Sequence, residues 1–324
     1  MIRPPLLSDN PADLLDHLEL RALRDADGNA SAAELLTELS MGGPSDARDE
    51  EDTTETLSEA MSAIADAVFT QAEDRSVHCG KDGYPFGIDG NVLLKEDSDF
   101  SRVYTFLLLL SSHGKDAVAG SDGAKLFEDV SAVAAASYLG SRDALREPLV
   151  FGFPRRVDVA NFPAAVANLC VYIGEGKSDD KMPNINKMKD AGLDIVFNKP
   201  FPDKKSSQLI AFGQCATGEN WWDKKYELQP GDWCREWMLK TPQVNPLKMF
   251  FIPHSISKDD WVHLGYQAGI VFDRFRIAYA CENTVNPELR KRLTAWSNAA
   301  RSKTVIATKK SRKRKRGKAK VKKR

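Results

Sequence analysis

Hydrophobic positions recur at helical spacing in the first third of the chain. Leu14, Leu15 and Leu18 fall on one face of such a pattern. Three segments share this spacing, namely 11–26, 30–41 and about 56–73. Polar, acidic and turn-forming residues at 42–56 separate the second segment from the third and are typical of a linker. The pattern therefore predicts a helical N-terminal region over 1–100 with an acidic linker near 42–56.

A second pattern, in which helices come first and strands follow, begins near residue 101. Helices are predicted over 101–112, 124–140, about 160–173 and 286–300, and strands over 193–201, 208–216, 248–253 and 269–281. Gly140 closes the second of these helices as a C-terminal cap. We therefore expect an α/β domain over 101–300, with a mixed sheet flanked by helices.

Asp194 breaks the apolar pattern of the strand predicted at 193–201. A buried carboxylate without compensation is costly, so a metal ion or a basic group should lie beside it. The segment PDKKSS joins this strand to the next as a hairpin, and the turn centre falls near Lys204 and Lys205. Antiparallel pairing then places Asp194 opposite Gln214 or Cys215. Gln208 would lie on the order of 20 Å from Gln214 along the strand, so it is not part of this site.

Glu128 lies on the helix predicted at 124–140 and borders its apolar stripe. From that position its carboxylate can lean toward the edge of the sheet. A solvated surface glutamate is the simpler interpretation when this residue is considered alone.

Together, KLFEDVSAVAAASYLG, GLDIVF and GQCATG resemble the restriction-endonuclease-like PD-(D/E)XK superfamily, and most closely its Mrr-like members. The resemblance covers roughly 124–225. It implies a restriction-endonuclease-like core in which Glu128 is the helix glutamate, Asp194 the metal-binding aspartate and Gln214 the replacement for the second acid.

One position departs from the family pattern. The family lysine would fall at residue 216, where this chain has Ala216. Lys224 and Lys225 follow shortly afterwards, and a lysine displaced onto the next helix could reach back to the site. If neither lysine reaches the metal, the fold is kept without the activity.

The resemblance implies hydrolysis of phosphodiester bonds with Mg (or Mn) as cofactor. Asp194, the side-chain oxygen of Gln214 and a backbone carbonyl near Cys215 would hold the ion, and Glu128 would complete its shell directly or through water. A lysine would stabilise the developing charge.

The C-terminal segment 309–324 contains 12 basic residues and no acidic one, whereas the preceding residues carry a net charge of −12. We expect a disordered basic tail over 301–324 that contacts nucleic acid through phosphates. A solubility tail, or an intramolecular clamp on the acidic body, is the alternative. The candidate nucleic-acid-binding residues are Lys309, Lys310, Arg312, Lys313, Arg314, Lys315 and Arg316.

Other features change this interpretation little. The five cysteines are never spaced as CxxC, which gives no indication of a zinc site or a disulfide framework. His254 could act as a base, and the tryptophans between 221 and 237 could stack on bases, but structural roles account for both. No apolar run is long enough for a membrane span and the first residues lack a signal-peptide core, so we expect a cytoplasmic protein.

The first functional hypothesis is a metal-dependent DNA endonuclease in bacterial restriction or antiphage defence, a setting implied by the resemblance alone. The alternative is a catalytically inactive nucleic-acid-binding or scaffold subunit. The sequence has no NTPase motif, so any ATP-driven step would need a partner ATPase or helicase.

Overall fold

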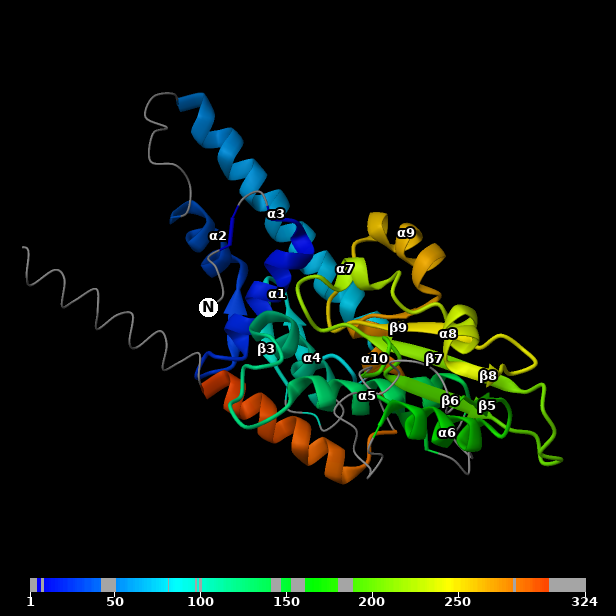
Figure 1. Ribbon diagram of the computed structural model, residues 1–324. Coiled ribbons are helices and arrows are strands. Elements are labelled where there is room, and N and C mark those ends of the chain that lie inside the picture. Colours follow the sequence, from blue (N-terminus) through cyan, green and yellow to red (C-terminus); the bar gives the residue numbers. More distant parts are fainter. Residues whose placement is uncertain are drawn as a thin grey trace, which may run out of the picture. The chain divides into compact units, whose positions relative to one another are not determined.

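The computed structural model describes residues 5–6, 9–41, 51–80, 82–96, 98, 101–140, 147–152, 161–179, 189–281 and 284–302, with only the backbone of 51–57. The chain divides into two compact units, which Figure 1 shows as ribbons. Unit 1 comprises Met1–Ser121 and Arg290–Arg324, and unit 2 comprises Asp122–Leu289. The boundary thus follows residue 121 instead of residue 100, because the apolar helix after residue 101 packs with the N-terminal elements.

Unit 1 is built from helices and a small antiparallel sheet. Its helices are α1 (Pro11–Ala22), α2 (Ala32–Met41), α3 (Glu51–His78), α4 (Arg102–His113) and most of a final helix over 287–302. Its strands, in the order β1-β3-β2, are β1 (Asn29–Ser31), β2 (Phe86–Asp89) and β3 (Val92–Lys95). The glycine-rich stretch before residue 92 therefore contributes a hairpin of β2 and β3.

A buried polar network joins the helices of unit 1. The Arg75 guanidinium of α3 donates to Asp16 at 2.6 Å and to Glu19 at 2.8 Å, both on α1. Tyr104 of α4 donates to Glu19 at 2.9 Å. A buried charge needs partners of this kind, because an unpaired one would be costly.

The predicted linker is only partly a linker. Helix α3 begins at Glu51, so 51–56 belong to a helix, and 42–50 lie outside the described residues. Acidic residues near a helix N-terminus favour helix formation through the helix dipole, which explains the earlier start.

Unit 2 contains a mixed five-stranded sheet in the order β10-β9-β7-β6-β4. The strands are β4 (Leu149–Val150), β6 (Ile195–Lys199), β7 (Leu209–Cys215), β9 (Leu247–Phe251) and β10 (Ile270–Phe272). Strands β4, β6 and β7 pair antiparallel, whereas β7, β9 and β10 are parallel. A separate two-stranded ribbon joins β5 (Lys177–Ser178) to β8 (Met238–Lys240).

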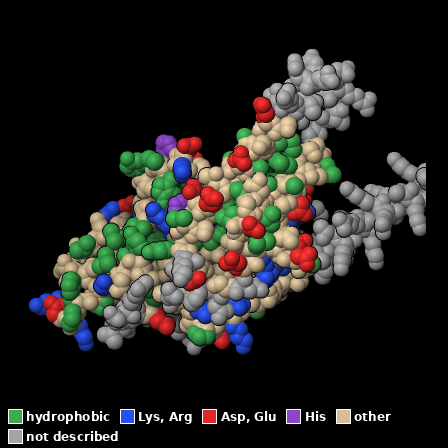
Figure 2. All heavy atoms as spheres, turned by 180° about the vertical axis from the view of Figure 1, so that it is seen from behind, with side chains coloured by type: hydrophobic (Ala, Val, Ile, Leu, Met, Phe, Trp, Pro, Cys, Tyr) green, Lys and Arg blue, Asp and Glu red, His purple; other side chains and the backbone are tan. Residues whose placement is uncertain are grey.

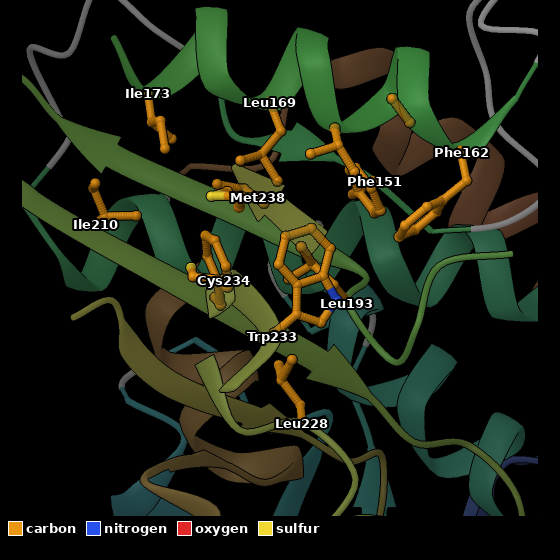
Figure 3. Close-up of a cluster of buried hydrophobic side chains, with 14 residues drawn as sticks. Phe151, Phe162, Leu169, Ile173, Leu193, Ile210, Leu228, Trp233, Cys234 and Met238 are labelled. Atoms are coloured by element: carbon orange, nitrogen blue, oxygen red, sulfur yellow. The ribbon is translucent and has the colours of Figure 1, made fainter. Parts of the chain in front are cut away.

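Helices cover both faces of this sheet, as the α/β prediction requires. Helices α5 (Gly123–Tyr138) and α10 (Arg274–Cys281) lie on one face, and α6 (Phe162–Ile173), α8 (Pro230–Trp237) and α9 (Lys258–Ala268) lie on the other. Figure 3 shows the core under α6 and α8, with the Trp233 ring near its centre. The Trp233 ring centroid is 5.5 Å from that of Phe212 and 5.8 Å from that of Phe151, both edge-on.

The hairpin register agrees with the sequence-based pairing. The pairs run from Ile195 with Gly213 to Lys199 with Leu209, and Asp194, just before β6, donates its N–H to the Gly213 carbonyl at 2.9 Å. A side chain at Gly213 would put its Cβ 2.9 Å from the Phe251 ring, so glycine allows β7 and β9 to pack closely here. Gln208 lies at the far end of β7, where its amide donates to the Ile173 carbonyl at the end of α6.

The strand predicted over 269–281 is wrong in its second half. Strand β10 ends at Phe272, and α10 begins at Arg274. Alternating arginines and apolar residues imitate a strand, but Ile277 and Cys281 are four residues apart and buried, as on a helix face. Arg274 is also buried, and its Nε donates to the Pro253 carbonyl at 3.0 Å.

None of the helices in the described parts of the chain has the length and apolar character needed to span a bilayer.

Candidate active site

The candidate site lies at one edge of the sheet of unit 2, where β4 and β7 end and β6 begins. The Asp194 carbonyl accepts the N–H groups of Phe151 at 2.7 Å and Gly152 at 3.1 Å. The Cys215 N–H donates to the Asp194 carboxylate oxygen Oδ2 at 2.7 Å. Backbone pairing on both sides therefore fixes Asp194 at this edge.

Glu128 reaches the same edge from helix α5 and is only 6% exposed. A Cβ on Gly152 would lie 2.8 Å from the Glu128 oxygen Oε2, so a side chain at residue 152 would displace this carboxylate. Glycine at the end of β4 thus makes room for the glutamate. The simple interpretation of Glu128 as a solvated surface residue is excluded by its burial.

Lys125 is the cation of this cluster. Its Nζ donates to both Glu128 carboxylate oxygens, at 2.8 and 3.0 Å. Its side chain is 13% exposed and that of Glu128 is 8% exposed, so the ion pair is largely shielded from water. The positive charge of Lys125 also acts on Asp194.

The surroundings of Asp194 oppose its ionisation. Burial, the largest cause, and the charges of Glu128 and Asp190 raise the pKa of Asp194 to about 8. The hydrogen bond from Cys215 and the charge of Lys125 act in the opposite direction without cancelling the effect of burial. A carboxylate in this setting is stabilised in its charged form by a bound cation.

The Cys215 thiol is not suited to be a nucleophile. Burial raises the pKa of this thiol well above its ordinary value, and the nearby Asp194 and Glu128 charges act in the same direction. The thiolate is the reactive form, and it is disfavoured here. Cys215 therefore contributes its backbone N–H to the site.

Gln214 offers an oxygen at the end of β7. Its side chain is 2% exposed, and its Nε2 donates to Glu227 at 2.7 Å. Its Oε1 is buried and has no hydrogen-bond partner among the described residues. Because buried carbonyl oxygens are normally paired, this atom is suited to accept from a water or to bind a cation.

Lys225 contacts aromatic residues and a backbone carbonyl. Lys225 is 2% exposed, its Nζ donates to the Trp222 carbonyl at 3.0 Å, and it lies 3.8 Å from the Trp222 ring centroid and 4.6 Å from that of Tyr226. Lys224 ends the short helix α7 (Trp221–Lys224) and is half-buried. The lysine that the structure brings to the carboxylates is thus Lys125.

Sequence reasoning passed over Lys125 although a signal for it exists. Lys125 and Glu128 are three residues apart on a helix, the spacing at which side chains share a face. The family pattern has its lysine on the strand of Gln214, whereas in this structure a lysine comes from the helix of Glu128.

The carboxylates of Asp194 and Glu128 are a sparse donor set for a hard divalent cation. Mg²⁺ is usually held by one or two carboxylates and keeps several of its waters. Within the described residues, no group of three or more His, Cys, Asp or Glu side chains is placed to hold a metal. Two carboxylates fit Mg²⁺, which keeps several of its waters, better than a metal that needs a full protein cage.

The chain matches no known protein family, no curated protein and no solved structure.

Proposed function

We propose that this protein is a metal-dependent DNA endonuclease that uses Mg (or Mn) to hydrolyse phosphodiester bonds. The observation that carries the proposal is the cluster of Asp194, Glu128 and Lys125 at a sheet edge. A restriction-endonuclease-like core is part of the proposal, and the mixed sheet with helices on both faces supports it.

The residues have distinct roles in this proposal. Asp194, Glu128 and the Gln214 oxygen would hold the ion, which when bound polarises the phosphate and lowers the pKa of its water. The Cys215 N–H orients the Asp194 carboxylate through its 2.7 Å hydrogen bond. Lys125 orients Glu128 and brings a positive charge that favours an anionic phosphate.

DNA is the proposed substrate because of the basic C-terminal segment. The seven candidate contacts between Lys309 and Arg316 lie outside the described residues, so this part of the proposal rests on charge. Removal of the residues after 308 should weaken DNA binding and flatten its salt dependence. An unchanged salt slope would argue against a DNA role for the segment.

The second candidate function is an inactive nucleic-acid-binding or scaffold subunit. Ala216, where the family pattern has lysine, favours it. A bacterial restriction or antiphage setting and a partner ATPase or helicase belong to either proposal and rest on the resemblance.

Plasmid cleavage separates the two candidates. Purified protein would be incubated with supercoiled plasmid and Mg²⁺ or Mn²⁺, beside the variants Asp194→Asn and Lys125→Met. Glu219→Gln, which changes an exposed acid after β7, is the matched control. We expect cleavage by the parent protein and the control, and loss of cleavage in both site variants.

Two results would change the conclusion. Cleavage that survives Asp194→Asn would show that the active site lies elsewhere. DNA binding without cleavage, in either metal, would favour the scaffold subunit.

A further inference from the structure

Unit 1 contains an apolar groove between helices α2 and α3. Its walls include Ala32, Ala33 and Leu36 of α2, and Met61, Ala65 and Asp66 of α3. Its volume is about 720 Å³. This volume is in the range of ~300–1,000 Å³ typical of ligand pockets, so the groove can hold several side chains of a bound segment.

The two helices that form the groove are acidic. Residues 32–41 and 51–74 contain no lysine or arginine, and between them they contain nine Asp or Glu residues. Figure 2 shows acidic side chains interspersed with hydrophobic ones along α3 at the upper right. The groove therefore favours an occupant that is apolar and positively charged.

The acids of α2 and α3 differ in how they are paired. Glu34 and Glu38 of α2 form ion pairs with Arg21 of α1. Glu59 and Asp66 of α3 are exposed and seven residues apart, so they share one stripe of the helix. Asp66 also lines the groove. Both acids of this stripe are therefore accessible to an incoming basic segment.

The chain carries a segment of the required chemistry at its C-terminus. Three apolar residues at 305–307 precede the basic run that starts at Lys309. This segment follows the final helix, most of which belongs to unit 1 as the groove does. An extended chain spans up to ~3.5 Å per residue, so 303–316 can reach ~45 Å. A unit of about 150 residues has a radius of gyration of ~15 Å, so the segment is long enough.

We propose that 303–316 docks into this groove, with Val305 and Ile306 on its apolar walls and the basic run along Glu59 and Asp66. The docked segment is then withheld from nucleic acid, since the same positive charges serve both contacts. A polyanion would have to displace the segment before binding it. The proposal rests on the groove and on charge, and it stands whether or not the Asp194 site is catalytic.

Zero-length carbodiimide crosslinking of the full-length protein tests this contact. The reagent joins a lysine amine to a carboxylate in direct contact, and peptide mapping then identifies the pair. We expect crosslinks from Lys309, Lys310 or Lys313 to Glu59 or Asp66. Their yield should be independent of protein concentration, because the contact lies within one chain.

Two sets of variants in the full-length chain test the apolar part of the contact. Val305→Ser with Ile306→Ser removes the apolar residues of the segment, and Met61→Lys places a positive charge in the groove. Each should lower the crosslink yield at least ~tenfold. The serine variant loses the buried apolar contact, and Met61→Lys loses the charge attraction between groove and segment. Val262→Lys, an equivalent change of an exposed apolar residue in unit 2, should leave the yield unchanged. Circular dichroism confirms that each variant is folded.

Three results would overturn the proposal. The first is crosslinking of the basic segment to acids of both units without preference for Glu59 and Asp66. The second is a crosslink yield that grows with protein concentration, which would indicate a second copy of the chain as the partner. The third is a yield that is insensitive to both Met61→Lys and the serine variant, which would reduce the contact to non-specific attraction.

Discussion

Replacement of Asp194 by asparagine should stabilise the metal-free protein. The change removes the charge but keeps the size of the side chain and an oxygen that can accept the Cys215 N–H. Burial raises the pKa of Asp194 from 3.8 to about 8, so the folded protein holds a proton at this residue near neutral pH. The unfolded chain does not, and folding therefore requires proton uptake by Asp194 but not by asparagine.

The size of the effect follows from the linkage between pKa and stability. Unfolding releases this proton between the two pKa values, so parent stability should fall as the pH rises from ~4 to ~8 and then level off. At ~1.4 kcal/mol for each pH unit, the upper limit at pH 7 is ~4 kcal/mol. Because Asp194 as a residue is only partly buried, solvent screening reduces this to an expected gain of ~2 kcal/mol for Asp194→Asn.

Urea unfolding with and without Mg²⁺ measures this gain. In the absence of metal, the parent should lose stability between about pH 5 and about pH 8, and Asp194→Asn should not. Mg²⁺ at about a hundred times its dissociation constant should stabilise the parent by ~2.7 kcal/mol, because the ion binds only the folded state. The variant should gain much less, since it lacks the charged ligand.

A control variant and two contrary results test this account of Asp194. Glu219→Gln changes an exposed acid and should leave both the pH profile and the response to Mg²⁺ unchanged. If Asp194→Asn destabilises the metal-free protein, the electrostatic account of the site is wrong. An equal Mg²⁺ response in parent and variant would exclude Asp194 as a ligand.

Three further predictions concern other residues. Lys125→Met should lower the rate of plasmid cleavage by ~10²–10³-fold, because a charge-stabilising donor is lost. Lys224→Met should leave this rate within about threefold of the parent. Equal effects of the two variants in a steady-state assay would contradict the assignment of Lys125 as the lysine of the site. Trp233→Ala should lower the free energy of unfolding by ~3–5 kcal/mol, because it leaves a cavity at the centre of the core in unit 2; a loss under ~1 kcal/mol in urea would contradict the packing. Burial and the charge of Arg24 lower the pKa of His113 to about 4. The stability that neutral His113 contributes is therefore complete above pH ~6.5, and up to ~3 kcal/mol of it is lost as the pH falls to ~4. His113→Gln should flatten this part of the pH profile of stability, measured by urea unfolding.

The local parts of the site were predictable because they depend on neighbours in sequence. A short hairpin fixes which residues face each other, so the turn near Lys204 was enough to set the register of β6 against β7 and to bring Asp194 to the Gly213–Cys215 end of β7. The helix of Glu128 and its closing glycine also followed from spacing. Gly140 has φ +80°, the left-handed conformation that its predicted capping role requires.

The short helix α10 shows where pattern alone is ambiguous. The sequence after Phe272 alternates polar and apolar residues and also fits a helix face over eight residues. Packing against α5 decides in favour of the helix, and the Cys281 thiol lies 3.6 Å from the Val130 carbonyl. Over so few residues the two periodicities overlap, and only tertiary contacts separate them.

The sequence by itself determined the hairpin, the helix of Glu128, the costly carboxylate at residue 194 and the separation of charge between body and C-terminus. These features depend on residue type and on spacing along one or two elements. Tertiary structure brought the pair of Lys125 and Glu128 to the sheet edge of Asp194, because this requires α5 to pack on the sheet. It likewise formed the groove between α2 and α3, since a cavity depends on how two helices pack and not on the pattern of either one.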